Sequence, residues 1–579
     1  MQSTIENLPR HLKKYVVDQN YSKYTSEDQA VWRYIMKQLK NYLQVHAHEA
    51  YIDGLEKTGI TLEQIPKIED IDKKLKQFNW SAVPISGFIP PAAFMEFQSL
   101  GVLPIASDIR TVDHIHYTPA PDIVHESAGH APILINQDFS NYLRSYATIA
   151  KKSIFSKEDL ELYDAIRDLS DIKENPRSTP EDIKKCEDRL ITVRDSMRYV
   201  SEAALLARMN WWTAEYGLIG SLDNPKIFGA GLLSSVGESR SCLQSEVKKI
   251  PLTVDCVEYS YDITERQPQL FVAETFETLI DVLEELANSM AFRRGGIFGL
   301  NRAKEALTVN TIELGSGLQL SGQLEEYEEL EGSPIFLKFK GPCQISLNNK
   351  QLDGHGTDFH SQGYSTPLGR IKGLRQSLDK LVLEDIKSLG WTAGKPLKID
   401  YESGFVVEGV LENITEIDTA VKILSFKGCT VKRGDSIYFR PEWGIFDLAL
   451  AESIPSVFGG PADRELFGDS DDFEAKIIPH RQITTEEKNL HQFYLEIRRA
   501  RKDLENQSAD NKKIQTYIDD FTQHFPEEWL IGIELYEMCI LSDFNGNAKN
   551  IVLDHLLNLK NTHPHLSTLI EDGIRLAEK

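Results

Sequence analysis

The spacing of apolar residues changes along this chain, and that change constrains the fold more than any single motif does. Residues 1 to about 75 and 122 to 150 carry apolar side chains at helical spacing. From 305 to about 445, stretches such as "TIELGSGLQL" and "VKILSFKGCTVKRGDSIYF" are rich in β-branched residues and glycine, which favours strands. Residues 484 to 579 return to helical spacing. A chain of 579 residues is also longer than one core usually serves, so we expect several modules.

We therefore expect an α+β protein in three parts. A mainly helical domain with a few short strands is expected over residues 1–304, a β-rich module over 305–460, and a linker with a helical module over 461–579. Inside the first part, residues 151–200 form two charged amphipathic patterns around the turn signal "ENPRSTPED", which predicts an inserted surface hairpin of helices. Prolines and glycines between 80 and 110 predict loops and a short helix. Ser26 is the expected cap of the first long helix.

Composition limits the partners and the compartment. The formal net charge of -24 disfavours nucleic acid or an anionic membrane surface as the main partner. No run of about 18 apolar residues occurs, so no membrane span is expected. The six cysteines are scattered without a C-x-x-C pair, which favours a reduced cytoplasm over a disulfide scaffold or a thiolate zinc site.

The stretch "YTPAPDIVHESAGHAPIL" is the main candidate for chemistry. Asp122 reads as a helix cap, followed by His125, Glu126 and His130. The order resembles the zinc-protease motif H-E-x-x-H, but the second histidine comes one place late. On an ideal helix, residues five apart lie about 140° apart around the axis, so one ion could bind both histidines only with a distortion such as a π-bulge. Gly129 lowers the cost of such a distortion.

A third ligand is available in "NWWTAEYGLIG", where Glu215 stands in an apolar, aromatic segment. Two histidines and one carboxylate form the facial triad of non-haem iron(II) oxygenases. Plainer interpretations remain open from the residues alone. The histidines could serve packing or capping, Glu215 could pair with a buried arginine, and Arg110 could pair with a surface carboxylate. His355 and His360, in "DGHGTDFHSQGY", lie in an expected loop where the sequence does not indicate a metal site.

Several motifs together resemble a known family. "ISGFIPPAAFMEF", "YTPAPDIVHESAGHAP", "WWTAEYGL", "FGAGLLSSVGE" and "DITERQPQLFVAETFETL" occur in the order typical of the tetrahydropterin-dependent aromatic amino acid hydroxylases. The resemblance covers roughly residues 60 to 300. It implies ring hydroxylation of an aromatic amino acid with iron(II), O2 and a reduced pterin that supplies two electrons. Phenylalanine is the expected substrate, by analogy with stand-alone bacterial-type catalytic domains, and tryptophan or tyrosine is the alternative.

The resemblance also implies a role for individual residues. His125, His130 and Glu215 would be the iron ligands. Glu126, not a ligand, would take part in catalysis while lining the pterin side. Gly87 and Phe94 would bind the pterin, Phe94 by stacking on its ring. Arg110 would bind the substrate carboxylate. The substrate backbone would be seated by Thr118, Gly231 and Ser234, and Trp211 would form an aromatic wall of the ring pocket.

Some features depart from the family pattern. The gap between His130 and Glu215 is longer than expected, and the 151–200 hairpin accounts for it. Asn210 stands where the animal enzymes are expected to have an aromatic residue. Residues 305–579 match no pattern of the family, the animal tetramerisation helix is not evident, and this region is a candidate surface for a partner or for homo-oligomers. Two other functions remain as alternatives: a zinc-dependent hydrolase, and a non-catalytic amino acid sensor.

Overall fold

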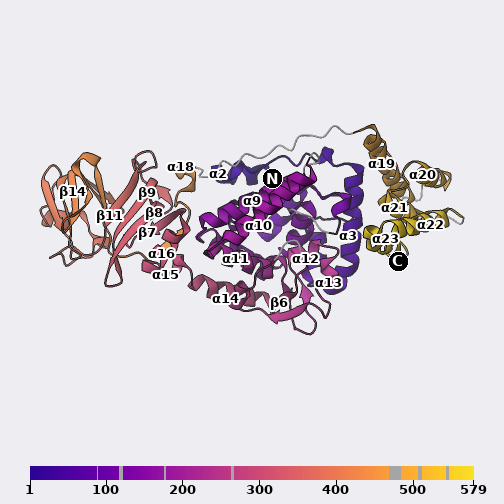
Figure 1. Ribbon diagram of the computed structural model, residues 1–579, viewed down its shortest axis with the longest axis horizontal. Coiled ribbons are helices and arrows are strands. Elements are labelled where there is room, and N and C mark those ends of the chain that lie inside the picture. The colour runs from indigo at the N-terminus through magenta and orange to yellow at the C-terminus, as the bar shows by residue number, and fades with distance from the viewer. Residues whose placement is uncertain are drawn as a thin grey trace.

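The protein is an elongated molecule in which helices and strands are mixed. The computed structural model describes residues 1–87, 89–116, 121–174, 178–261, 266–468, 484–505, 511–542 and 547–579. The β-rich part lies at one end, the largely helical N-terminal half is in the centre, and the C-terminal helices lie at the other end (Figure 1). Within these residues no helix has both the length and the apolar character needed to cross a bilayer.

The N-terminal half is built around long helices with one buried face. Helix α3 (Ser26–His46) begins at Thr25, whose side chain accepts from the Asp28 backbone N–H, so the expectation of Ser26 as the cap was wrong by one residue. Helix α8 packs against α6 and α14. The other helices of this half that matter below are α6 (Pro91–Ser99), α8 (Gln137–Ala150), α11 (Glu202–Asn210) and α14 (Phe276–Asn288).

Two small sheets complete this half. Strands β1 (Ser81–Ile85) and β2 (Val102–Ala106) pair in parallel on either side of α6, so the expectation of loops and one short helix between 80 and 110 missed two strands. Every residue of β2 is buried, which removes the alternation that reveals a half-exposed strand. The other sheet has the order β4-β3-β6-β5, with bounds Leu218–Ile219 (β3), Lys226–Ile227 (β4), Lys248–Pro251 (β5) and Gln269–Ala273 (β6).

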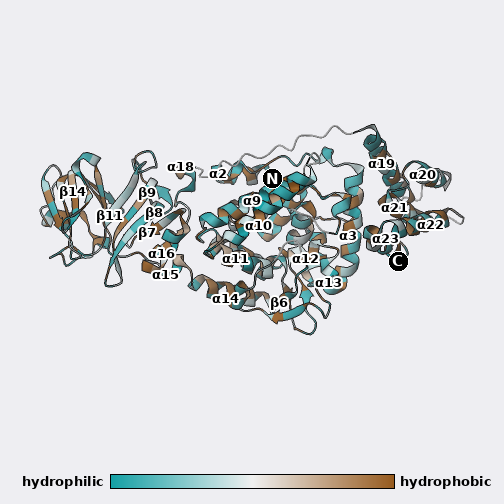
Figure 2. Cartoon of the chain, in the orientation of Figure 1, coloured by the Kyte–Doolittle hydropathy of each residue, from teal (hydrophilic) through white to brown (hydrophobic). Residues whose placement is uncertain are grey.

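A hairpin of two helices occupies the stretch expected to be an insertion. Helix α9 (Lys157–Glu174) packs on α10 (Pro180–Ser196), and a Lys173–Glu187 ion pair of 3.0 Å links them. The Thr179 side chain caps α10, in agreement with the cap signal in the sequence. Figure 2 shows hydrophilic residues along both helices, as on a surface element.

The β-rich part contains two sheets with separate cores. One sheet has the order β10-β9-β8-β7-β17, with β11 added to β9, and the other has the order β12-β13-β14-β15, with β16 added to β14. Helix α16 (Gly296–Ala306) turns its buried face into the core of the first sheet. The strands are Val309–Glu313 (β7), Leu318–Leu330 (β8), Ser333–Leu347 (β9), Lys350–Gln351 (β10), Gly363–Pro367 (β11), Pro396–Asp400 (β12), Phe405–Ile417 (β13), Ala420–Arg433 (β14), Ser436–Phe439 (β15), Phe446–Ala449 (β16) and Ser456–Gly459 (β17).

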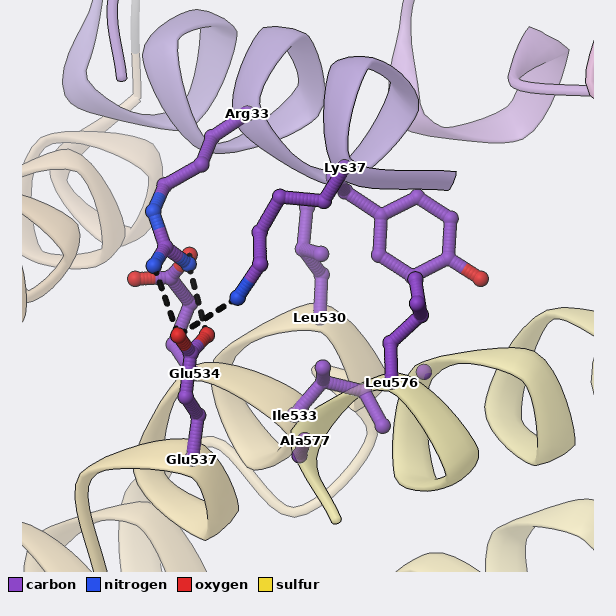
Figure 3. Close-up of a pocket in the computed structure, with 10 residues that line it drawn as sticks. Arg33, Lys37, Leu530, Ile533, Glu534, Glu537, Leu576 and Ala577 are labelled. Atoms are coloured by element: carbon purple, nitrogen blue, oxygen red, sulfur yellow. Dashed lines mark hydrogen bonds and ion pairs between the residues drawn. The ribbon is translucent and has the colours of Figure 1, made fainter. Parts of the chain in front are cut away.

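The C-terminal helices dock on α3 and share its apolar core. Figure 3 shows Arg33 and Lys37 reaching from α3 to two glutamates of α21 (Trp529–Leu541). Arg33 forms a two-pronged pair with Glu537 at 2.7 and 2.8 Å and contacts Glu534 at 2.9 Å. These charges are largely buried, so breaking one partner is costly. The remaining helices of this part are Thr485–Glu505 (α19), Asn511–His524 (α20), Asn547–Thr562 (α22) and Ser567–Ala577 (α23).

Candidate metal centre and substrate site

Two histidines meet on one face because the helix that carries them is a π-helix. The element η4 (Val124–His130) has π geometry, which confirms the distortion expected from the five-residue spacing. In a π-helix the hydrogen-bonded partner is five residues away, so residues five apart lie nearly over one another. The rings of His125 and His130 accordingly have centroids 5.0 Å apart. The Asp122 carboxylate caps the turn by accepting from the His125 backbone N–H at 3.0 Å.

Glu215 approaches both histidines from a second π-helix, η5 (Trp211–Glu215). Its Oε2 lies 3.3 Å from His125 Nε2, and its Oε1 lies 3.2 Å from His130 Nε2. Ligand bonds of about 2.1 Å meeting at right angles would place donor atoms about 3 Å apart. The two imidazoles and the carboxylate therefore fit adjacent positions on one metal ion. The partner of Glu215 is this histidine pair, not a buried arginine.

Burial and charge act in opposite directions on the two carboxylates of the site. Burial alone would raise the pKa of Glu215, but His130 and His125 hold that pKa well below its usual value. Burial raises the pKa of the Glu126 carboxyl to about 8, and the opposing effect of His130 does not offset it. Glu126 Oε2 is buried and accepts no hydrogen bond from the residues that the structure describes. A buried acceptor of this kind is suited to a polar ligand.

Ser234 fixes the orientation of one candidate ligand. Its Oγ donates to the Ala230 carbonyl oxygen at 2.8 Å and lies 3.1 Å from His125 Nδ1. Since the hydroxyl proton is directed to the carbonyl, His125 Nδ1–H is the donor in the second contact. The Nε2 lone pair then faces Glu215 and the metal position, as in metal-binding histidines generally.

Arg110 is held by a buried carboxylate, a partner that sequence analysis did not identify. Asp122 accepts from Arg110 Nε at 2.8 Å and from Nη2 at 2.7 Å, and both side chains are almost fully buried. Burial alone would raise the pKa of Asp122, but the Arg110 charge keeps it below its usual value. The third guanidinium nitrogen, Nη1, makes a longer contact of 3.4 Å with the Ser234 carbonyl oxygen. Asp122 thus joins the candidate substrate arginine to the histidine-bearing helix.

Aromatic rings form a stack beside Glu215. Trp211 lies between Tyr216 and Tyr261, with ring centroids 4.4 Å from each and near-parallel planes. Asn210 contributes an amide whose Nδ2 lies 3.5 Å from Glu215 Oε1. The two tyrosines were not identified from the sequence, and only the fold brings Tyr261 to the end of η5. Asn210 was singled out only as a departure from the family pattern.

Two glycines allow the short helix α12 (Ala230–Ser234) to pack closely against η4 and against the Tyr216 ring, which follows η5. A Cβ on Gly129 would lie 2.6 Å from the Ala230 carbonyl oxygen, and a Cβ on Gly231 would lie 2.8 Å from the Tyr216 ring. The first glycine therefore permits backbone packing as well as the local distortion. This close approach is what places Ser234 within reach of His125.

The sequence of this half matches a described family. A profile described as "Biopterin-dependent aromatic amino acid hydroxylase" matches residues 11–158 and 199–306. The N-terminal half of the chain is therefore similar to this family over those two stretches. The match stops at the start of the α9–α10 hairpin and resumes after it, so the hydroxylase pattern surrounds the hairpin without including it.

Proteins similar to this half of the chain include bacterial enzymes. Phenylalanine-4-hydroxylase of Mesorhizobium japonicum is 28% identical over 274 residues, which cover 47% of this chain and 83% of that protein. The Pseudomonas aeruginosa protein of the same name is 25% identical over 270 residues, 46% of this chain and 86% of its own. A solved structure of Chromobacterium violaceum phenylalanine hydroxylase aligns at TM-score 0.38 with 23% identity, covering 50% of this chain and 90% of that one.

Three further residues were assigned through the resemblance to the hydroxylases: Gly87, Phe94 and Thr118. Gly87 has φ of +50°, a conformation that favours glycine, in the turn before α6. Phe94, on α6, packs in part against an apolar cluster of the N-terminal helices and β1. Thr118 falls outside the described residues. The pterin and substrate roles of these three remain predictions.

Proposed function

We propose that this chain is an iron(II)- and tetrahydropterin-dependent monooxygenase that converts L-phenylalanine to L-tyrosine. The observation that carries the proposal is the convergence of His125, His130 and Glu215 from two π-helices, beside a buried arginine. The family match and the names of the bacterial relatives support the same reaction. Iron(II) and the reduced pterin, when bound, supply the electrons that activate O2 for ring hydroxylation.

The protein residues would divide the remaining work. His125, His130 and Glu215 would hold the metal and leave coordination positions open for O2. The unpartnered Oε2 of Glu126 would face the pterin, with Gly87 and Phe94 holding the pterin ring. These groups position the reactants and keep water from them.

Substrate binding would use the charge and the aromatic rings already in place. Because Asp122 occupies Nε and Nη2 of Arg110, we assign the substrate carboxylate to Nη1, which has the longest contact of the three nitrogens. Thr118, Gly231 and Ser234 would seat the amino acid backbone, Ser234 through its main chain, whose carbonyl oxygen already contacts Arg110. Trp211, already stacked between two tyrosines, would form a rigid wall for the apolar ring.

We also propose the division of the chain that the sequence indicates. Residues 1–304 would be the catalytic domain with the 151–200 hairpin inserted, 305–460 a β-rich module, and 461–579 a linker with a helical module. Contacts with a partner or a second copy would use residues 305–579. The cytoplasm is the proposed compartment, because all six cysteines are free thiols.

The deciding experiment is oxygen uptake with iron(II), a tetrahydropterin and phenylalanine, tyrosine or tryptophan in turn. Phenylalanine should give the fastest uptake, with one tyrosine formed per turnover in the coupled reaction. Glu215→Ala should abolish product while the circular dichroism spectrum is retained. Glu246→Ala, the same change at an exposed glutamate, is the control and should keep full activity. Tyrosine formation by Glu215→Ala would exclude Glu215 as a ligand, and faster turnover of tryptophan would overturn the substrate assignment.

A further inference from the structure

The β-rich part contains a second group of side chains with metal-binding chemistry, distant in sequence from the first. His355 and His360 lie in the loop between β10 and β11, and Asp447 lies on β16. His355 Nδ1 is 3.2 Å from His360 Nε2 and 3.9 Å from Asp447 Oδ2. One donor atom from each of the three residues lies within 4.8 Å of the others. The loop had been expected to carry no such site, and Asp447 gave no signal in the sequence.

The Asp447 carboxylate is the observation that points to a ligand. Its side chain is 3% exposed, and its Oδ1 accepts from Ser425 Oγ at 2.6 Å. Its Oδ2 is buried and has no hydrogen-bond partner in the described part of the chain. A buried carboxylate oxygen without a partner is costly, so a positive charge is expected beside it.

The two imidazoles do not supply that charge. Burial lowers the pKa of His360 to about 4, and burial also lowers the pKa of His355 although Asp447 opposes the effect. Burial thus favours the neutral imidazole, which is the form that binds metals. A simple hydrogen bond between the two rings would satisfy one nitrogen of each and would still leave Asp447 Oδ2 at 3.9 Å.

The spacing of the three donor atoms fits a tetrahedral ion. Zinc–nitrogen and zinc–oxygen bonds of about 2.0–2.2 Å place tetrahedral ligand atoms roughly 3.3–3.6 Å apart. The observed separations of 3.2 and 3.9 Å lie on either side of this range. A set of two nitrogens and one oxygen suits zinc better than calcium or magnesium, which prefer oxygen ligands only.

We propose that His355, His360 and Asp447 form a second metal site, which binds a divalent ion of the zinc class and leaves one position to water. The site lies where the two sheets of the β-rich part meet. Its loop joins strands of the first sheet, since β11 pairs with β9, whereas β16 belongs to the second sheet through β14. The ion would therefore connect the loop to the other sheet. The exposed Phe359 ring lies beside His360, with a distance of 4.8 Å between the ring centroids.

The test separates this site from the hydroxylase centre. The full-length chain carrying His125→Ala and Glu215→Ala, which lacks the first centre, is titrated with Zn²⁺ in competition with a chromogenic chelator. One equivalent should bind. Adding Asp447→Asn or His355→Gln should weaken that binding by more than the roughly 10–100-fold that loss of an outer-shell partner costs. His563→Gln, at a partly exposed histidine paired with Glu527, is the matched control and should bind one equivalent.

Cobalt(II) gives an independent readout, because a tetrahedral site produces intense visible absorption that the Asp447→Asn chain should lack. If Asp447→Asn fails to fold, His355→Gln decides the question alone, since His355 is the more exposed of the two side chains. The proposal is overturned if the parent chain binds no zinc equivalent, or if zinc binding survives both substitutions.

Discussion

Ser234→Ala is expected to weaken iron binding about tenfold and to leave phenylalanine binding almost unchanged. The Ser234 hydroxyl contacts His125 Nδ1 at 3.1 Å, so its loss removes the group that orients the imidazole. The contact between Ser234 and Arg110 uses the backbone carbonyl oxygen, which alanine retains. The substitution therefore separates a role at the metal from a role at the substrate carboxylate.

The magnitude follows from the environment of His125. Loss of an outer-shell partner typically costs 10–100-fold in metal affinity. A neutral hydrogen bond contributes about 0.5–1.5 kcal/mol net, and the His125 side chain is 16% exposed, so water can replace part of the lost bond. We therefore expect the lower end of the range, about 1.4 kcal/mol or tenfold in Kd.

The assay is equilibrium iron(II) binding to the apoenzyme under anaerobic conditions, followed by steady-state kinetics at saturating iron. Ser239→Ala is the matched control, because Ser239 is a buried serine close in the chain. Among the described residues, its hydroxyl has one hydrogen bond, to the Val236 carbonyl oxygen at 3.3 Å. An unchanged iron Kd together with a tenfold higher KM for phenylalanine would refute the reasoning and assign Ser234 to the substrate.

Two further predictions concern buried charges. Asp122→Asn should destabilise the protein by about 3 kcal/mol, because the amide keeps one acceptor oxygen and loses the negative charge that pairs with Arg110. In Asp122, one oxygen accepts from Arg110 Nη2 and the His125 backbone N–H, and the other accepts from Nε and the backbone N–H of Arg110. A lower urea midpoint and a higher phenylalanine KM would show this, and an unchanged midpoint would contradict it. Acid should release the C-terminal helices from α3. Burial alone would raise the pKa of Glu537, but Arg33 and Lys37 lower it to about 2, so its stabilising contribution is complete above about pH 4.5 and is lost as the pH falls towards 2. Limited proteolysis should show more cleavage near α21 as the pH falls from 4.5 towards 2. The Glu537→Gln variant should show that cleavage already at neutral pH. Equal resistance of the variant and the unchanged protein at every pH would contradict the role of Glu537 in docking.

Local patterns in the sequence determined much of the fold. The cap signal before α10, the helical spacing of α3 and α8 and the β-rich character of residues 305–445 all depend on neighbours a few residues apart, and the structure has the corresponding elements. The five-residue histidine spacing likewise predicted a π distortion, because the requirement that both rings face one point is local. Strand β2 was missed for the complementary reason, since a fully buried strand shows no alternation of apolar and polar residues.

The sequence alone thus determined the histidine pair, the carboxylate candidate Glu215 and the family that they resemble. Only the tertiary structure decided which groups meet. It joined Arg110 to Asp122, Ser234 to His125, and Asp447 to His355 and His360. These pairs are separated by many residues along the chain and carry no periodic signal. Their contacts depend on how helices and sheets pack, and the cost of burying a polar or charged group without a partner favours each of them.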